Sequence, residues 1–428
     1  MSAPRIAAPD LERRNPGVSR STIVGIALAS ALVPLNSTMV AVALPKLARA
    51  FGIGRGRAGV LITVYLVAML IGQPLSGRVS DAFGNKRVVL LSLVGFAACS
   101  TGAALAPTFL WLVGARGLQA VFASALAPSV QSMLRSVTEP SERGHAFGIL
   151  GSVIGVGAAS GPIVGGALLG LFGWKAIFFA NLPVVAVTLV VLASVKAPRI
   201  DAAPPDDAST SIASEIPRHH LREPTYVAAF ATHALANLGQ YSLLLVAPLA
   251  LDHRGWGAGA TGLALSALTV GLIVMGPPGG KYGDRLGAKR AVTRGLCFSA
   301  FGAATLVPFG IGVPPVMLIV ALALFGTGLG FASPSITAAG LGAVSPQRTG
   351  VAAGLLSASR YVGSIIASVM LSTFVADDGS GARVMFVAAG VALVLAVAAA
   401  RWLPARSLRH HQVAVGFGRV GWARKQYP

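Results

Sequence analysis

The chain has 428 residues, of which 54% are hydrophobic and only 11% are charged, and its net charge is +20. A soluble protein of this length would have about a quarter charged residues, so the composition excludes a soluble domain and indicates a membrane protein with many spans. The positive charge does not indicate nucleic-acid binding, because its distribution follows the membrane topology.

Twelve mostly apolar stretches reach about twenty residues, the length that a helix needs to cross a bilayer. They lie near 21–44, 58–77, 87–106, 109–134, 144–169, 174–195, 225–250, 258–279, 290–309, 314–340, 349–373 and 384–403. We therefore predict an all-α membrane protein with twelve transmembrane helices. A Pro/Ala/Ser/Asp-rich stretch divides the spans six and six. The expected parts are an N-terminal tail (1–20), a first bundle (21–195), a linker (196–223), a second bundle (224–403) and a C-terminal tail (404–428).

Lys and Arg residues are unevenly divided between the two sides of the predicted membrane. With the N-terminus inside, the inner segments hold 25 of them and the outer loops hold seven. This positive-inside bias predicts an integral protein of the cell membrane (inner or plasma membrane) with both termini in the cytoplasm. The first outer loop departs from the bias for no reason visible in the sequence, since it contains Lys46, Arg49, Arg55 and Arg57.

A charged stretch with regular glycines occurs twice. Gly77–Arg87 returns 203 positions later as Gly280–Arg290, with Gly, Asp, Gly, Lys and Arg in the same register. The repeat indicates that the two six-span bundles are related. Tight packing at Gly77 and Gly84, with Lys86 and Arg87 on anionic headgroups, accounts for most of the motif. It does not account for Asp81 and its counterpart Asp284, which can accept hydrogen bonds from a neighbouring helix N-terminus.

Two further arginines lie inside predicted spans. Arg116 is about eight residues into the fourth span, roughly 12 Å deep in a hydrocarbon core about 30 Å thick. A charge there costs at least ~2.5–3.5 kcal/mol. We therefore expect Arg116 to face a central cavity with polar partners and to act in substrate-anion binding or coupling. Arg360, in the eleventh span, either joins this site or hydrogen-bonds helix carbonyls.

Two stripes of residues stand out at helical spacing. In the fifth span, Gly157, Gly161 and Gly165 form a small-residue row, which fits close helix packing. With Pro162 bending the helix, the same row can serve as a sliding surface. In the seventh span, polar residues share one face. These residues are His233, Asn237, Gln240 and Tyr241. A single histidine in a membrane helix often serves only in packing, but four polar residues on one face indicate that this face lines a cavity.

All fourteen acidic residues lie in tails, loops or span edges, so the spans hold arginines but no deep carboxylate. A permanent cation at mid-membrane depth needs a counter-charge. We therefore expect neutral or anionic substrates to be preferred over permanent cations. If protons are coupled to transport, Asp81, His233 or the substrate itself must carry them.

The six-plus-six plan and the repeated motif resemble the major facilitator superfamily, over roughly residues 20–405. Four segments resemble its drug:proton antiporters, the multidrug efflux families: Leu35–Pro45, Arg116–Ala120, the pattern Gly157-x-x-x-Gly161-Pro162-x-x-Gly165-Gly166, and Gly173-Trp174-Lys175 with Phe178 and Asn181-x-Pro183. The chain departs from the family at Asn36, where span one usually carries aspartate. It also departs at Ala82 and Asn85, where the repeated motif usually carries arginines.

The resemblance implies secondary active efflux of small organic compounds, drug-like or metabolic, by alternating access with proton antiport. It implies gating or coupling roles for the residues of the repeated motif and of the span-five row, with Asp81 in a latch on the inner side. It places Asn36 and Gln119, with Arg116, at the substrate site. The two bundles would surround a site at mid-membrane depth.

Two other functions stay open: an importer or uniporter of a small neutral or anionic metabolite, and a non-transporting membrane sensor or scaffold. The expected partners are a small-molecule substrate, protons and membrane lipids, with no nucleic acid, and we expect a monomer. We expect no enzymatic activity, cofactor or metal site, since there is no P-loop and no cluster at metal-ligand spacing.

Overall fold

The computed structural model describes residues 20–138, 143–194, 223–344, 349–376 and 381–405, and these ranges contain helices and no strands. Inside helices, the side chains of a few further residues, among them Asp81, lie outside the description. The first bundle consists of α1 (Arg20–Ala50), α2 (Arg55–Ala58), α3 (Val60–Phe83), α4 (Asn85–Ala104), α5 (Phe109–Val137), α6 (Arg143–Phe172), α7 (Ala176–Phe179) and α8 (Asn181–Ser194). The second consists of α9 (Pro224–His253), α10 (Ala258–Leu286), α11 (Ala288–Ala304), the short 3-10 turn η2 (Gly310–Gly312), α12 (Pro315–Gly342), α13 (Thr349–Phe374) and α14 (Ala382–Ala400).

The predicted fold class is confirmed. In the described ranges, 11 helical segments are long and apolar enough to cross a membrane. The twelfth, α11, has 17 residues and occupies the position of the ninth predicted span. The sixth predicted span is interrupted at Ala180, between α7 and α8. Most helices run beyond the apolar stretches, because a helix does not have to end where the hydrocarbon ends.

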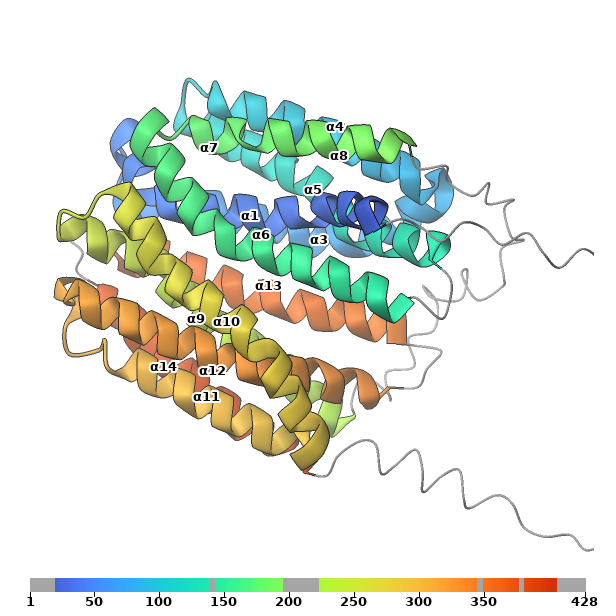
Figure 1. Cartoon of the computed structure of the whole chain (residues 1–428). Helices are drawn as coiled ribbons and strands as arrows, with labels where there is room; N and C mark the ends of the chain where they lie inside the picture. The colour runs from blue at the N-terminus through green and yellow to red at the C-terminus, as the bar shows by residue number, and fades with distance from the viewer. Residues whose placement is uncertain (1–19, 139–142, 195–222, 345–348, 377–380, 406–428) are drawn as a thin grey trace, which may run out of the picture.

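The helices pack side by side along one common direction (Figure 1). In the first bundle α1 packs on α6 and α8, and α5 packs on α3 and α4. In the second bundle α12 packs on α10 and α11, and α9 packs on α13 and α14. The bundles are joined mainly by α6 with α10, α3 with α13, and α1 with α9, and α2 also contacts α13. We call the end where α8 stops and α9 starts the linker end, and the other end the far end.

The repeated motif forms the same backbone turn twice. Gly84, between α3 and α4, has φ +83°, and Gly287, between α10 and α11, has φ +93°. Each glycine N–H donates a hydrogen bond of 2.9 Å to a carbonyl four residues earlier. A side chain would be strained at this φ, so glycine is needed. Helix α3 remains helical to Phe83, beyond the predicted end of the second span at residue 77, and a single residue makes the turn.

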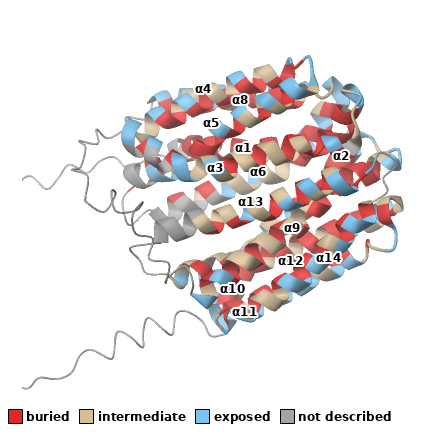
Figure 2. Cartoon of the chain, turned by 180° about the vertical axis from the view of Figure 1, so that it is seen from behind, coloured by how far each residue is buried: buried red, intermediate tan, exposed pale blue. Residues whose placement is uncertain are grey.

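Burial separates the two ends of the molecule. One buried apolar cluster runs from the far-end half of the first bundle, through residues such as Leu44 and Leu61, into the second bundle at Leu249. The linker-end half of the first bundle has its own cluster, around Phe96 and Leu126. The bundles therefore share a core toward the far end. Exposed residues lie on the outward faces of the helices (Figure 2). Many of them have large apolar side chains, as expected of surfaces that meet lipid.

Candidate functional site

Arg116 lies at the centre of a polar network in the first bundle. Its side chain is fully buried, and its guanidinium donates hydrogen bonds to Oδ1 of Asn36 in α1 and, at 2.6 Å, to Oε1 of Gln119 in α5. The guanidinium carbon also lies 4.2 Å from the ring centre of Tyr65 in α3, a cation–π geometry. The sequence therefore predicted its need for polar partners correctly. In this conformation, however, Arg116 faces protein and not an open cavity.

The network continues through neutral groups to α4 and α8. Gln119 Nε2 donates to Ser100 Oγ at 2.5 Å, and Asn181 Nδ2 donates to the same oxygen at 3.2 Å. Asn181 also bonds the carbonyl of Phe178 at 3.2 Å, across the break between α7 and α8. In the described part of the chain these are amides and hydroxyls, and no carboxylate joins them. Dipoles therefore stabilise the buried charge of Arg116 without neutralising it.

The polar stripe of α9 divides into two parts. His233 and Asn237 are buried, and Asn237 Nδ2 donates to the carbonyl of His233 at 3.0 Å. The His233 side chain lies against the backbone of Leu356 in α13, which favours a packing role for this residue. Gln240 and Tyr241 are half-buried. Of these two, Tyr241 lies at the interface between the bundles.

Tyr241 connects three helices at this interface. Its side chain lies beside Ser37 of α1 and Ser364 of α13 and interacts with both. Next to it, Tyr361 Oη accepts a hydrogen bond of 3.0 Å from Gln73 Nε2 of α3. The polar residues of one bundle thus contact those of the other at mid-depth.

Arg360 completes the arrangement. It is exposed, and it interacts electrostatically with His233, Tyr241 and Tyr361. We call the set around this junction the central polar site: Asn36, Tyr65, Arg116, Gln119, Tyr241, Arg360 and Tyr361. Five of the substrate residues predicted from the sequence belong to this site: Asn36, Arg116, Gln119, Tyr241 and Arg360. His233 and Asn237 lie beside the site. Gln240 makes no described interaction with it.

Sequence reasoning did not assign five polar residues to this region: Tyr65, Gln73, Ser100, Tyr361 and Asn181, of which Asn181 was named only as part of a family motif. All five lie in or next to predicted spans, so the signal was present. The search for charges and for stripes on a single helix passed over them. Their role appears only when different helices are brought together, as when Ser100 of α4 receives bonds from α5 and α8.

The span-five glycines contact α1 of their own bundle. A Cβ at Gly157 would lie 3.0 Å from Ala31, a Cβ at Gly165 would lie 2.9 Å from Met39, and a Cβ at Gly161 would overlap Thr38. The small-residue row therefore joins α6 to α1. The other face of α6 meets the second bundle. There a Cβ at Gly166 would lie 2.5 Å from the carbonyl of Ala258, and a Cβ at Gly262 would overlap the carbonyl of Pro162. The roles of these residues in gating stay predictions.

The inner-gate residues are only partly described. Asp284 and Arg87 are exposed, and Lys86 is half-buried. The side-chain surroundings of Gly77 and Asp81 lie outside the described residues, so the predicted latch stays a prediction. Asn85, which replaces a family arginine, donates a hydrogen bond of 2.9 Å from Nδ2 to Ser132 of α5.

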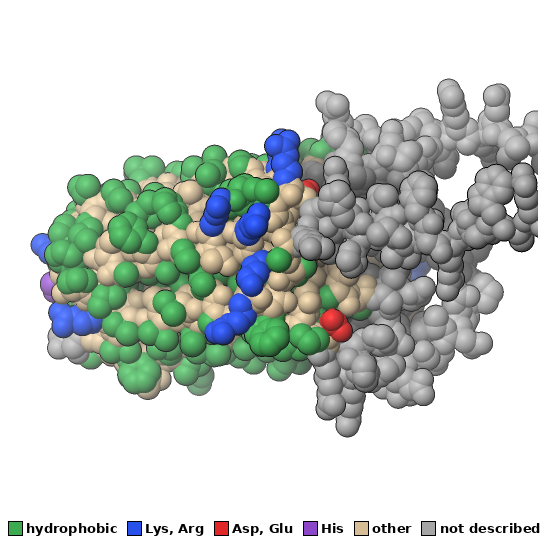
Figure 3. Space-filling model, turned by 90° about the horizontal axis from the view of Figure 1, so that it is seen from below, with side chains coloured by type: hydrophobic (Ala, Val, Ile, Leu, Met, Phe, Trp, Pro, Cys, Tyr) green, Lys and Arg blue, Asp and Glu red, His purple; other side chains and the backbone are tan. Residues whose placement is uncertain are grey.

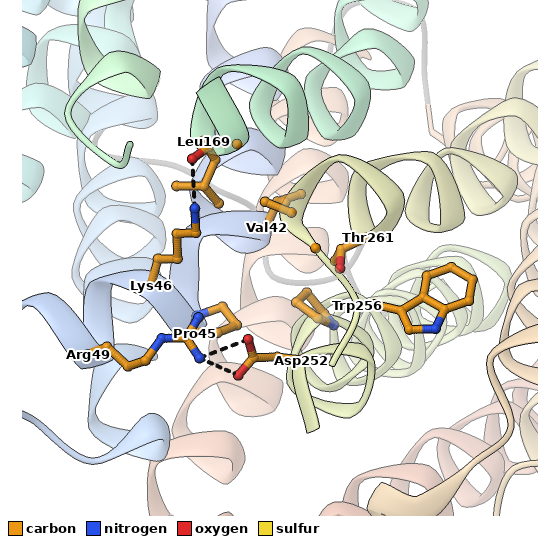
Figure 4. A pocket seen from close by; sticks show the side chains of 12 residues that line it. Val42, Pro45, Lys46, Arg49, Leu169, Asp252, Trp256 and Thr261 are labelled. Atoms are coloured by element: carbon orange, nitrogen blue, oxygen red, sulfur yellow. Dashed lines mark hydrogen bonds and ion pairs between the residues drawn. The ribbon is translucent and has the colours of Figure 1, made fainter. Parts of the chain in front are cut away.

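The far end explains two of the unexpected outer basic residues. Arg49 Nη1 forms an ion pair with Asp252 of α9, 2.9 and 2.8 Å from its two oxygens, and so joins the bundles (Figure 4). Lys46 Nζ donates at 2.8 Å to the carbonyl of Leu169, in the last turn of α6. Both residues lie in α1, so placing them in a loop was wrong. They border a cavity of about 270 Å³ that Asp252 and Trp256 also line.

The chain is similar to known membrane transporters. The Major Facilitator Superfamily model matches residues 26–368 and, in a second match, residues 229–422. The "Uncharacterized MFS-type transporter YvkA" of Bacillus subtilis (strain 168) is 28% identical over 395 residues, covering 82% of this chain and 89% of that protein. The "Multidrug resistance protein Stp" of Mycobacterium tuberculosis (strain CDC 1551 / Oshkosh) is 26% identical over 406 residues, covering 83% and 75%. The crystal structure of a bacterial homolog of the human lysosomal transporter Spinster, inward-facing and unoccupied, has a TM-score of 0.73 at 17% identity. That match covers 90% of this chain and 97% of the other, and it concerns the fold alone.

Proposed function

Because the chain belongs to the Major Facilitator Superfamily and is a membrane transporter, not an enzyme, we propose that it exports small organic compounds from the cell in exchange for protons. The mechanism is alternating access, in which the two bundles open first to one side of the membrane and then to the other. The similarity to a multidrug resistance protein supports export over import.

One observation carries the proposal: polar groups from both bundles meet at mid-depth in a chain that is otherwise apolar. Gln73 of the first bundle hydrogen-bonds Tyr361 of the second at 3.0 Å, and Tyr241 of the second bundle lies beside Ser37 of the first. Such groups are costly inside a membrane and mark substrate or ion pathways. A site shared by both bundles changes when they move, which is what alternating access requires. A membrane scaffold would not need it.

The contacts between the bundles support a state that is closed at the far end. Arg49 and Asp252 pair there, and Ser368 of α13 donates a hydrogen bond of 2.9 Å to the carbonyl of Gly59 beside α3. The shared apolar core lies in the same half. At the linker end the first bundle has a separate core. We therefore assign this conformation to the step that receives substrate from the linker end.

The linker end is assigned to the cytoplasm of a cell whose plasma membrane contains the protein. Exposed basic residues lie where α10 ends and α11 begins: Lys281, Arg285, Arg290 and Arg294. On this side of the molecule, Lys and Arg side chains form a row at the border of a broad hydrophobic area (Figure 3). Basic residues at one border of an apolar belt favour the cytoplasmic side and anionic headgroups. Both termini and the linker are then cytoplasmic.

Few groups of the protein can carry the protons that are exchanged for substrate. Acidic residues in the described ranges lie at or next to helix ends, as Asp252 does in α9. The candidate carriers are therefore Asp81, His233 and an ionisable group of the substrate. With Asp81 as part of the inner latch, its protonation would release the linker end. We take the transporter to act as a monomer in contact with membrane lipids.

Inside-out membrane vesicles test the function directly. A panel of radiolabelled anionic, neutral and cationic aromatic compounds is added outside vesicles that are acidified inside, with protein-free vesicles as the control. We expect accumulation of some of these compounds, and we expect a protonophore to abolish it. Equilibration without accumulation would identify a uniporter, and gradient-driven loss from preloaded vesicles would identify an importer. Transport of no compound in any direction would contradict the proposal.

A further inference from the structure

Arg360 is a membrane-embedded cation with no ion-pair partner among the described side chains. It lies eleven residues after the start of α13, roughly 17 Å along the helix at 1.5 Å per residue. The nearest acidic residue along α9 is Asp252, which pairs with Arg49 at the far end. No hydrogen bond from the Arg360 guanidinium to a described residue is formed. A charge at this depth is costly, so its retention calls for a function.

Arg360 lies on the part of α13 that packs against α3 and α9, the helices that carry the neighbouring polar residues. Ser364 is four residues further along α13, on the same helix face, and it contacts Tyr241 of α9. Arg360 itself acts electrostatically on His233, Tyr241 and Tyr361, which belong to the interior of the molecule. Its exposure therefore means access to space beside the site.

Arg116 differs from Arg360 in every respect that matters for binding. It is fully buried, two of its hydrogen bonds go to Asn36 and Gln119, and the Tyr65 ring covers its face. A ligand could reach it only after this network is broken. Of the two intramembrane arginines, Arg360 is the one available to a ligand in this conformation.

We propose that Arg360 anchors the acidic group of an aromatic, amphipathic organic anion. A guanidinium binds a carboxylate or sulfonate through two parallel hydrogen bonds, and the partner supplies the missing counter-charge. Tyr241 and Tyr361, which are half-buried and lie close enough to Arg360 to interact with it electrostatically, offer ring faces for an aromatic body. The inference rests on the proposed transport function, for which it names the substrate class and the residue that selects it.

The test measures the charge preference of the site without requiring transport. In a full-length background carrying Cys99→Ala and Cys297→Ser, Ser357→Cys places a thiol one turn from Arg360, on the same face of α13. Its labelling rates are measured with an anionic (sulfonatoethyl) and a cationic (trimethylammonioethyl) methanethiosulfonate, alone and with naphthalene-2-sulfonate or naphthalene-2-sulfonamide as competitor. The matched control is Arg290→Gln, because Arg290 is an exposed arginine outside the site, at the start of α11.

We expect both reagents to reach the thiol and Arg360→Gln to lower the anionic-to-cationic rate ratio about tenfold, as expected for a unit charge one helical turn away in a partly aqueous site. Arg290→Gln should leave the ratio unchanged. The sulfonate should slow labelling more than the sulfonamide does, and Arg360→Gln should remove that difference. An unreactive thiol, a ratio that does not depend on Arg360, or a sulfonate that protects no better than the sulfonamide would overturn the proposal. Because labelling needs no transport, failure of the vesicle assay would be a separate result.

Discussion

At the scale of single residues, Arg116 and Arg360 show how the same side chain can serve two purposes in one protein. The dipoles of Asn36 and Gln119 and the ring of Tyr65 hold Arg116 and link helices α1, α3 and α5. Arg360 is exposed and has no such set of partners in the described residues. Removing the first should therefore affect folding, and removing the second should affect binding.

Arg116→Ala should lower the thermal unfolding temperature of the detergent-purified protein clearly. The substitution leaves the Asn36 and Gln119 oxygens buried without a donor, at about 1–3 kcal/mol for each such group, and it opens a cavity beside Tyr65. Arg360→Gln should unfold close to the wild-type temperature, because it breaks no described hydrogen bond of the guanidinium. Differential scanning fluorimetry of both variants makes the comparison. Equal losses of stability in the two variants would show that the distinction between them is wrong.

The sequence could predict that Arg116 is deep and needs partners, since both follow from counting residues along an apolar stretch. The family resemblance grouped Asn36 and Gln119 with Arg116, but the sequence could not show that they hydrogen-bond its guanidinium or that Tyr65 of α3 covers it, because these contacts between α1, α3 and α5 form only through tertiary packing. Asn36 had been identified as the position of a family aspartate, and the structure places its amide oxygen on the Arg116 guanidinium. At this position the chain has a neutral acceptor where a carboxylate would cancel the charge.

At the scale of helices, the apolar stretches predicted where the spans are but not how they end or break. Helix α3 extends to Phe83 because it ends at the turn made by Gly84. The hydrophobicity of the sequence does not predict the position of that turn. The glycines of span five predicted close helix packing, but only the tertiary structure shows which face of this helix contacts which neighbouring helix. Gly161 lies on α1, whereas Gly166, five residues on, lies on α10.

The contact between α6 and α10 is where a glycine substitution should change the conformational equilibrium. Gly262→Ala places a methyl group against the carbonyl of Pro162, so α10 must move away from α6 at the far end. Overpacking of about 1–3 kcal/mol would shift the equilibrium about tenfold toward the state that is open at the far end.

Spin labels introduced by Leu110→Cys and Val316→Cys, both exposed near the far end in different bundles, would report a longer distance by electron–electron double resonance. Gly170→Ala, where no atom lies within 4 Å of the added Cβ, is the control. Identical distance distributions in the two variants would argue against this view of the interface.

At the scale of the whole molecule, the internal repeat explains more than its motif. The spacing of 203 residues that relates the two motif copies also separates Arg49 from Asp252, which pair across the bundle interface. The same spacing relates Gly59, packed on α13, to Gly262, packed on α6. Equivalent positions near a two-fold axis meet each other, as in an isologous dimer interface. The repeat was visible in the sequence, and extending its register beyond the motif would have identified the partner of Arg49.

The ion pair at this pseudo-symmetric position should act as a weak lock on the far end. Its side chains are 56% and 15% exposed, and pairs of this kind contribute about 0–1 kcal/mol, or up to about fivefold in a conformational equilibrium. Asp252→Asn should therefore increase the labelling rate of a thiol introduced by Thr261→Cys, which lines the cavity beside the pair, by up to that factor. The exchange Arg49→Asp with Asp252→Arg should restore slow labelling, because the opposite charges still face each other. Arg57→Gln, which removes an exposed charge near the same end, should leave the rate unchanged. If the charge exchange labels as fast as Asp252→Asn alone, the attraction between these two residues does not hold the far end closed.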